Sequence, residues 1–314
     1  MPVASDNKRV AVIGSGLIGR AWAIVFTGAG CRVALHDSVP GVAARAKDLV
    51  AEGLRELAAH GLVADADGAA ARVRVANDLA DALDGAEFVQ ENTPETLAAK
   101  RAIFTELDRL AAPDAILASS TSTIVASLFT EPLAGRHRCL VAHPVNPPHL
   151  VPLVELVGAP WTAPATVAAA KAFYEAVGQV PIVVQKEIEG FVLNRLQAVL
   201  LSEAFRLVQS GHVTPQDLDK TLKDGLGMRW SFMGPFETIE LNAPGGIPDY
   251  CARYGPSLAR LSAADPAIYA GDALARVLAL WGGGLSADQV AARMRWRDRR
   301  LAALKAHKRA QPTD

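Results

Sequence analysis

Of the seven histidines in the sequence, His143 stands in the position best suited to chemistry. It follows the apolar run Cys139–Val141 and opens the proline-rich segment HPVNPP, so we expect it at the carboxyl end of a strand. Ligands of open α/β sheets bind beyond such strand ends. Histidine is also the most frequent general base, because its pKa lies near operating pH. We therefore predict that His143 takes a hydroxyl proton, with His149 in the same loop as a weaker candidate.

A carboxylate interrupts the apolar run VPLVELVG at Glu155. Burying a carboxylate is costly unless it is paired, and a nearby histidine would supply the partner. A carboxylate in that place orients the imidazole and stabilises its protonated form. We predict this orienting role for Glu155; the alternative is a glutamate at a solvated sheet edge.

A glycine-rich turn follows the apolar run Arg9–Ile13 and opens a segment with helical spacing. This order places exposed backbone N–H groups where they can bind a pyrophosphate. Asp37 ends the next apolar run, at the distance expected for a carboxylate that binds ribose hydroxyls and repels a 2′-phosphate. We predict NAD as the cofactor, in preference to NADP; the alternative is a tight turn beside a surface aspartate. The turn consists of Gly14, Ser15, Gly16, Leu17, Ile18 and Gly19.

The elements that must position these residues alternate along the first part of the chain. Short apolar runs typical of buried parallel strands are separated by alanine-rich stretches with helical spacing. This alternation, with right-handed crossovers, predicts an α/β fold with a doubly wound, mostly parallel (Rossmann) sheet. The runs are Arg9–Ile13, Arg32–Leu35, Phe88–Gln90, Ala115–Ala118, Cys139–Val141, Val154–Val157 and Ile182–Val184.

The pattern changes near residue 187, after which strand-like runs are few. The segment FVLNRLQAVLLSEAFRLVQSG predicts a long buried helix, and Thr214 followed by Asp217 is typical of a helix N-terminus. We predict an NAD-binding domain over residues 1–187 and an all-helical domain over residues 188–314. The basic C-terminal tail is expected to be a solvated helix face with a frayed end.

Composition narrows the class of protein. A formal net charge of −1 gives no global attraction to nucleic acid or to an anionic membrane. The three widely spaced cysteines fit free thiols better than disulfides or a zinc site, so we expect no metal. The sequence shows no signal-peptide pattern at its start and no apolar run near the roughly 20 residues of a membrane span. A cytoplasmic enzyme or binding protein is expected.

The sequence resembles the L-3-hydroxyacyl-CoA dehydrogenase superfamily over nearly its full length, most closely the λ-crystallin/L-gulonate 3-dehydrogenase branch. The resemblance lies in the segments VIGSGLIGRAWA, ASSTSTI, VAHPVNPPHLVPLVELV, VQKEIEGFVLNRLQ, GLGMRWSFMGPFET and RWRD. It implies an NAD-dependent dehydrogenase, and a homodimer formed through the helical C-terminal domain.

The same resemblance implies a catalytic set of Ser122, His143, Glu155 and Asn194. In such enzymes the histidine takes the hydroxyl proton as hydride leaves C3, and the glutamate orients the histidine. The serine and the asparagine hydrogen-bond the reacting oxygen of the substrate. The residues implied to contact the cofactor are Glu95, Lys100, Ser122 and Asn146.

Two segments bear on the substrate, which in this superfamily carries a hydroxyl β to a carboxyl or thioester. Acyl-CoA enzymes have a lysine-rich hairpin where this chain has Ala43–Arg72, in which acidic residues outnumber basic ones. Arg229 has a guanidinium suited to a free carboxylate, the alternative being a surface arginine. We therefore predict a small 3-hydroxy acid such as L-gulonate. The alternatives are a short-chain 3-hydroxyacyl-CoA, a carnitine-type substrate held by Trp230 and Phe232, and a non-catalytic NAD-binding protein.

Overall fold

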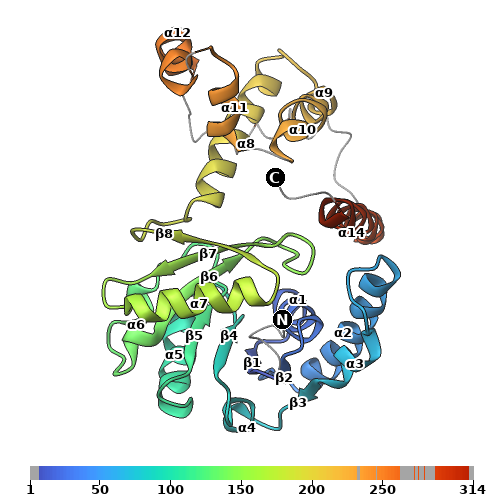
Figure 1. The fold of residues 1–314 in the computed structure, drawn as a ribbon, viewed down its shortest axis with the longest axis vertical. Coiled ribbons are helices and arrows are strands. Elements are labelled where there is room, and N and C mark those ends of the chain that lie inside the picture. The colour runs from blue at the N-terminus through green and yellow to red at the C-terminus, as the bar shows by residue number, and fades with distance from the viewer. Residues whose placement is uncertain are drawn as a thin grey trace. The chain divides into compact units, whose positions relative to one another are not determined.

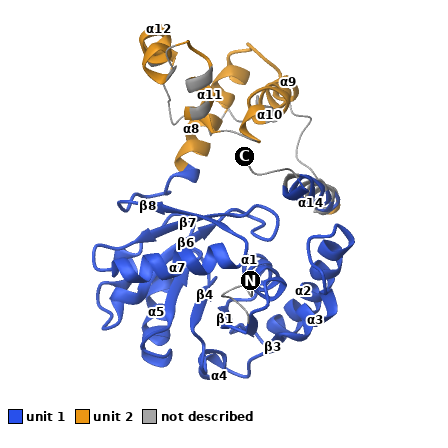
Figure 2. Ribbon diagram, viewed as in Figure 1, with its two compact units in different colours: residues 1–194, 292–314 blue, residues 195–291 orange. Residues whose placement is uncertain are grey.

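In this computed structural model the residues described are 7–231, 234–244, 246–261, 272, 275, 279 and 287–310 (Figure 1). The chain divides into two compact units: unit 1 comprises residues 1–194 and 292–314, and unit 2 comprises residues 195–291 (Figure 2). The predicted boundary at residue 187 lies close to the start of unit 2. Residues 292–314, however, cluster with unit 1, because Ala302 is buried among the apolar side chains of that unit.

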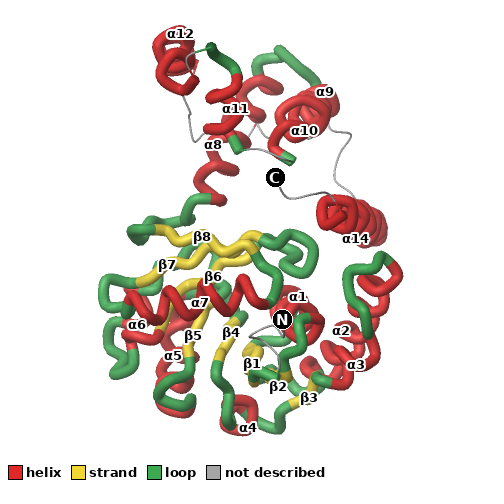
Figure 3. The backbone as a smooth tube through the Cα atoms, in the orientation of Figure 1, coloured by secondary structure: helices red, strands yellow, loops and turns green. Residues whose placement is uncertain are grey.

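Unit 1 is built on an eight-stranded sheet in the order β3-β2-β1-β4-β5-β6-β7-β8 (Figure 3). Neighbouring strands are parallel except for β6 and β7, which are antiparallel. The strands are β1 (Arg9–Ile13), β2 (Arg32–His36), β3 (Val73–Val75), β4 (Phe88–Glu91), β5 (Ile116–Ser119), β6 (Cys139–Pro144), β7 (Leu153–Gly158) and β8 (Val180–Val184).

The predicted doubly wound, mostly parallel sheet is confirmed, and every predicted apolar run overlaps a strand. Among these strands, only β3 has no counterpart in the runs predicted from the sequence. This strand has three residues, of which Arg74 and Val75 are exposed, so it has no apolar run that could predict it.

Helices cover both faces of the sheet (Figure 1). Successive strand residues point to opposite faces: Val12 lies in a cluster with Trp22 of α1, and Ile13 lies in a second cluster with Phe104 of α5. The helical segments that lie before unit 2 are α1 (Leu17–Gly28), α2 (Val42–Ala59), α3 (Ala66–Ala71), α4 (Leu79–Leu83), α5 (Leu97–Leu110), α6 (Ser127–Thr130), η1 (Arg136–Arg138) and α7 (Pro164–Ala176).

The remainder of the described chain is helical. The helix predicted as buried, α8 (Leu193–Gln209), forms, but Leu196 and Val199 are 65% and 67% exposed. Apolar residues at helical spacing predict an apolar face, but they do not show whether the same chain covers it. The predicted N-terminus at Thr214 is confirmed, because its hydroxyl accepts a hydrogen bond from the backbone N–H of Asp217. The other segments are α9 (Pro215–Lys220), the π-helix η2 (Thr221–Leu226), α10 (Gly227–Trp230), α11 (Pro235–Leu241), α12 (Gly246–Leu261) and α14 (Ala287–Ala310).

None of the cysteines Cys31, Cys139 and Cys251 forms a disulfide bond, and the first two are buried. Burial, reinforced by the charge of Asp108, raises the pKa of the Cys139 thiol to about 12, so this thiol is unreactive at neutral pH. In the part of the chain that the structure describes, no helix is long and apolar enough to cross a membrane. The same residues include no group of three histidine, cysteine or acidic side chains placed to hold a metal.

Candidate active site

The glycine-rich turn joins β1 to α1, and packing requires two of its glycines. Gly14 has a φ of 86°, and a Cβ there would lie 2.7 Å from the carbonyl oxygen of Asn92. A Cβ at Gly19 would lie 1.9 Å from the carbonyl oxygen of Gly14. At Gly16, by contrast, a Cβ would meet no atom of the chain within 4 Å. The turn is therefore tightly packed on its inner side and open to a ligand at Gly16.

The N-terminus of α1 fits a pyrophosphate. Its N-cap, Gly16, makes no side-chain hydrogen bond to the first turn, and that turn contains no acidic residue. The first N–H groups of a helix lack intrahelical partners and lie at the positive end of the helix dipole. An anion at this helix end would therefore find hydrogen-bond donors and a favourable field.

Asp37 lies directly after β2 and is held against the glycine turn. Its Oδ2 accepts a hydrogen bond from the backbone N–H of Ser15 at 2.8 Å, and its Oδ1 accepts one from the N–H of Val39 at 3.0 Å. Each carboxylate oxygen keeps a further lone pair for an external donor. This negative charge beside the turn fits ribose hydroxyl groups and disfavours a 2′-phosphate.

His143 and Glu155 form a buried pair between β6 and β7. Their Nδ1 and Oε2 atoms are 2.8 Å apart, and the side chains are 7% and 0% exposed. With Nδ1 on a carboxylate, the neutral imidazole carries its proton on Nδ1 and its free lone pair on Nε2. The structure thus brings together the predicted base and the carboxylate predicted to orient it, and it assigns Nε2 as the basic atom.

The second oxygen of Glu155 fixes the chain that enters α8. Its Oε1 accepts hydrogen bonds from the backbone N–H groups of Val192 at 2.8 Å and Leu193 at 3.0 Å. Burial raises the pKa of Glu155, but the hydrogen bonds from His143, Leu193 and Val192 outweigh burial and hold the pKa below its ordinary value. Glu155 is therefore ionised at neutral pH. The adjacent Phe191 is fully buried, and its ring lies 5.5 Å from the imidazole of His143.

Ser122 and Asn194, also predicted for the catalytic set, are in direct contact. The Nδ2 group of Asn194 donates to the carbonyl oxygen of Ser122 at 2.8 Å. Asn194 directly follows the two residues that Glu155 binds, so one carboxylate contacts the base and the segment that carries the asparagine. A continuous set of contacts links all four residues of the predicted set.

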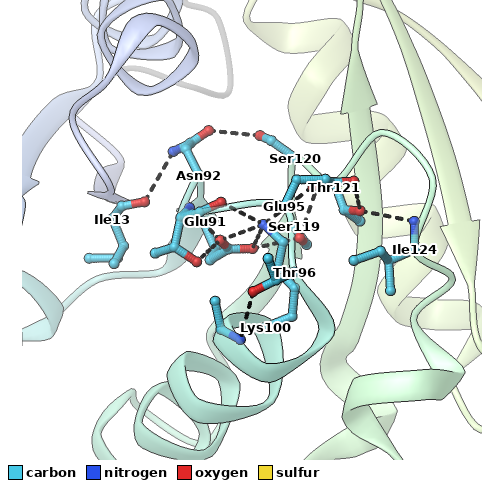
Figure 4. A network of polar contacts seen from close by, with 12 residues as sticks. Ile13, Glu91, Asn92, Glu95, Thr96, Lys100, Ser119, Ser120, Thr121 and Ile124 are labelled. Carbon is cyan, nitrogen blue, oxygen red and sulfur yellow. Dashed lines mark hydrogen bonds and ion pairs between the residues drawn. The ribbon is translucent and has the colours of Figure 1, made fainter.

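Glu95 is hydrogen-bonded to the loop that carries Ser122. Its Oε1 accepts hydrogen bonds from the backbone N–H groups of Ser122 at 2.7 Å and Thr123 at 3.2 Å, and from the hydroxyl of Thr121 at 2.6 Å (Figure 4). Its side chain remains 41% exposed. Glu95 therefore organises this loop and keeps surface that a ligand can reach.

Lys100 is buried, with 1% of its side chain exposed, and its Nζ lies 2.8 Å from Oε1 of the buried Glu91 (Figure 4). Glu91 was not predicted as a functional residue. Its position at the end of the strand FVQE could have pointed to a buried, paired carboxylate, as the position of Glu155 within an apolar run did.

Other residues predicted from the sequence belong to the loop between β6 and β7 and to unit 2. Asn146 is exposed in the loop between β6 and β7, and the carbonyl of His149 in the same loop accepts a hydrogen bond from Lys305 at 3.0 Å. Arg229 is exposed on α10 in unit 2. Phe232 lies outside the described residues.

The hairpin α2–α3 covers the segment where acyl-CoA enzymes would carry lysines. Arg55 on α2 lies 3.7 Å from Asp67 on α3, and both side chains are largely exposed. The carboxylate of Asp65 caps α3 by accepting a hydrogen bond from the backbone N–H of Gly68. An arginine paired with an aspartate offers less positive charge to a phosphate than an unpaired arginine does.

A cavity of about 680 Å³ lies between α1, α2, α7 and α14, and none of the four residues of the predicted catalytic set lines it. Its walls are mainly apolar, and its cations, Lys305 and Arg309, donate hydrogen bonds to the carbonyl groups of His149 and Leu62. Both cations therefore already form hydrogen bonds within unit 1.

Comparison with known proteins identifies close relatives. A lambda-crystallin of Oryctolagus cuniculus is 41% identical over 314 residues, which cover 97% of each chain. An L-carnitine dehydrogenase of Streptomyces coelicolor is 40% identical over 260 residues, which cover 82% of this chain and 81% of the relative. The crystal structure of 5-formyl-3-hydroxy-2-methylpyridine 4-carboxylic acid 5-dehydrogenase, an NAD+-dependent dismutase, matches with a TM-score of 0.85 at 29% identity, covering 98% of this chain and 100% of that chain.

Family models match both parts of the chain. Residues 9–188 match the NAD binding domain of 3-hydroxyacyl-CoA dehydrogenase, and residues 190–270 match the C-terminal domain of the same enzyme. The first match contains the glycine turn, Asp37 and the His143–Glu155 pair, which agrees with the predicted cofactor, NAD. The chain is an NAD-binding oxidoreductase and belongs to the 3-hydroxyacyl-CoA dehydrogenase family.

Proposed function

We propose that this protein oxidises the 3-hydroxyl group of a small free 3-hydroxy acid, with L-gulonate as the leading candidate. The observation that carries the proposed chemistry is the 2.8 Å contact between His143 Nδ1 and Glu155 Oε2. This contact leaves a basic nitrogen and a fixed negative charge, the two requirements for removing a hydroxyl proton.

The proton moves from the substrate hydroxyl to Nε2 of His143. The imidazolium formed is stabilised by Glu155, whose ionised carboxylate is already in contact with Nδ1. NAD, when bound, accepts the hydride that leaves C3 of the substrate. Loss of the hydroxyl proton to His143 and of the hydride from C3 would convert the hydroxyl into a carbonyl.

Ser122 and Asn194 are proposed to hold the reacting oxygen. One N–H of the Asn194 amide is used by the carbonyl of Ser122, which leaves the second N–H and the serine hydroxyl for a ligand. Donors fixed in this way favour the reacting geometry, because their orientation is set before the substrate binds.

Two observations support a free acid. The α2–α3 hairpin pairs Arg55 with Asp67, so it is poorly suited to the phosphates of coenzyme A. The names of two relatives, an L-carnitine dehydrogenase and a dehydrogenase of a pyridine carboxylic acid, specify substrates with a carboxylate and no coenzyme A. We propose that Arg229 binds the substrate carboxylate.

The alternatives are a short-chain 3-hydroxyacyl-CoA and a carnitine-type acid. The second would use Trp230, which is 43% exposed, as one wall of an aromatic cage. Initial rates of NADH formation with L-gulonate, L-3-hydroxybutyrate, L-carnitine and 3-hydroxybutyryl-CoA distinguish these substrates. The proposal expects the highest kcat/KM for a free acid without a trimethylammonium group.

We also propose a homodimer. The apolar side chains of Leu196 and Val199 on α8 are exposed in the single chain, and such a contiguous apolar face is typical of a subunit interface. Light scattering coupled to size exclusion tests this proposal, which expects twice the 33.1 kDa of the chain. A mass of one chain at micromolar concentration would contradict it.

A further inference from the structure

We infer that Glu91 is a positioning residue of the active site: through Lys100 and Glu95 it fixes loop 121–123, which carries Ser122. The inference rests on the proposed function, because it gives Ser122 a role in catalysis. It adds a buried residue that touches neither the substrate nor the predicted base.

Glu91 ends β4 and is fully buried. Its Oε1 accepts hydrogen bonds from the backbone N–H of Thr93 at 2.5 Å, the Thr93 hydroxyl at 2.6 Å and Lys100 Nζ at 2.8 Å. Its Oε2 accepts hydrogen bonds from the Ser119 hydroxyl at 2.5 Å and Lys100 Nζ at 3.1 Å. These donors occupy both oxygens of the carboxylate, so its position is fixed.

Lys100 links this buried anion to the surface. Its Nζ contacts Glu91 and the carbonyl oxygen of Thr93, and it lies 3.8 Å from Oε2 of Glu95. One ammonium group is therefore shared by a buried and a half-exposed carboxylate. Glu91 holds the closer position.

The position of loop 121–123 depends on which carboxylate, Glu91 or Glu95, pairs with the ammonium of Lys100. While Glu91 holds Lys100, Oε1 of Glu95 accepts hydrogen bonds from the N–H groups of Ser122 and Thr123, and the carbonyl oxygen of Ser122 accepts one from Asn194. Figure 4 shows Glu91, Lys100 and Glu95 in this arrangement. Without the charge of Glu91, the buried ammonium would have Glu95 as its nearest anion. The cost of an unpaired buried charge would then draw Glu95 inward, away from the loop.

The test compares Glu91→Gln with a matched control, Asp108→Asn. Asp108 forms a buried ion pair with Arg138 at 2.9 Å in the same unit, with exposures of 11% and 7%. Both substitutions remove one negative charge from a buried pair, so both are expected to lower the melting temperature. Only Glu91→Gln is expected to lower kcat, by about tenfold or more, as loss of a positioning interaction does.

A second measurement reports on the loop without turnover. Hydrogen exchange of the peptide that spans residues 119–125 is expected to become about tenfold faster in Glu91→Gln and to stay unchanged in Asp108→Asn. Thr93→Val, which removes one hydrogen bond to Glu91 and lies outside that peptide, is a milder variant with the same expected direction, should Glu91→Gln fail to fold. If the proposed substrate class is wrong, the unaltered chain has low activity with it. If the inference about Glu91 is wrong, hydrogen exchange of this peptide is unchanged in Glu91→Gln.

The order of action is tested in a Glu95→Gln background. If Glu91 acts through Glu95, adding Glu91→Gln to Glu95→Gln lowers kcat no further. Two results would overturn the inference: losses that add in the double variant, or a Glu91→Gln protein that loses stability like Asp108→Asn but keeps its kcat and loop exchange.

Discussion

His143 and Glu155 are register partners on β6 and β7, the one antiparallel pair of neighbouring strands in the described sheet. Directly opposite residues of antiparallel strands place their side chains on the same face and close together. Their Nδ1–Oε2 distance is 2.8 Å, and the second oxygen of Glu155 holds the chain just before Asn194. The antiparallel pairing of β6 and β7 thus brings His143 and Glu155 together, and Glu155 connects this pair to α8, which carries Asn194.

Replacing the base tests its assignment. His143→Gln is expected to lower kcat by about a thousandfold, because it removes the proposed general base, and to change the Kd for NAD by less than about twofold. His149→Gln, a change in the same loop, is the control and keeps its kcat. Steady-state rates and NAD titrations measure both quantities. Substantial turnover by His143→Gln would reassign the base.

Replacing the orienting carboxylate affects both rate and acid stability. Glu155→Gln is expected to lower kcat by about a hundredfold, because the imidazolium loses its counter-charge. The pKa of Glu155 is lowered in the folded chain, which therefore binds fewer protons at this group than the unfolded chain does. Its stabilising contribution is complete at neutral pH and is lost as the pH falls below about 5, through the ordinary pKa towards the lowered one.

Urea unfolding at several pH values measures this contribution. The free energy of unfolding of the unaltered chain should fall more between pH 6 and pH 4 than that of Glu155→Gln. The other titrating residues are common to both proteins, so the difference between the curves reports on Glu155 together with its partner His143. Parallel curves would show that Glu155 does not carry a lowered pKa.

The sequence predicted the parts of the fold that repeat a pattern. Buried strands appear as apolar runs, and the glycine turn and Thr214 carry specific local signals. The exposure of α8 was not predicted, because spacing alone does not show what covers an apolar face. The network around Glu91 was also missed: its contacts with Ser119 and Lys100 join residues that are distant along the chain.

We propose that the charge of Asp37 favours NAD over NADP. Asp37→Asn keeps the shape of the side chain and removes the charge, so the ratio of kcat/KM for NAD to that for NADP is expected to fall by about tenfold or more. Some loss of stability is also expected, since the backbone N–H groups of Ser15 and Val39 donate to this carboxylate. Rates with both cofactors measure the ratio, and an unchanged ratio would refute the role of the charge.

Replacing Arg229 tests its proposed role in binding the substrate carboxylate. Arg229→Met is expected to raise KM for the free acid by about tenfold to hundredfold, with little effect on the Kd for NAD. Arg253→Met is a matched control, because Arg253 forms an exposed helical ion pair with Asp249 in the same unit. If the two variants give equal KM values, Arg229 does not bind the substrate.

The central claim is that the buried His143–Glu155 pair serves the oxidation of a small free 3-hydroxy acid by NAD. The most direct measurement is NADH formation by the purified chain with L-gulonate and with 3-hydroxybutyryl-CoA at matched concentrations. The account predicts a kcat/KM for the free acid about a hundredfold above that for the thioester, a difference of about 2.7 kcal/mol. A higher kcat/KM for the coenzyme A thioester would contradict it.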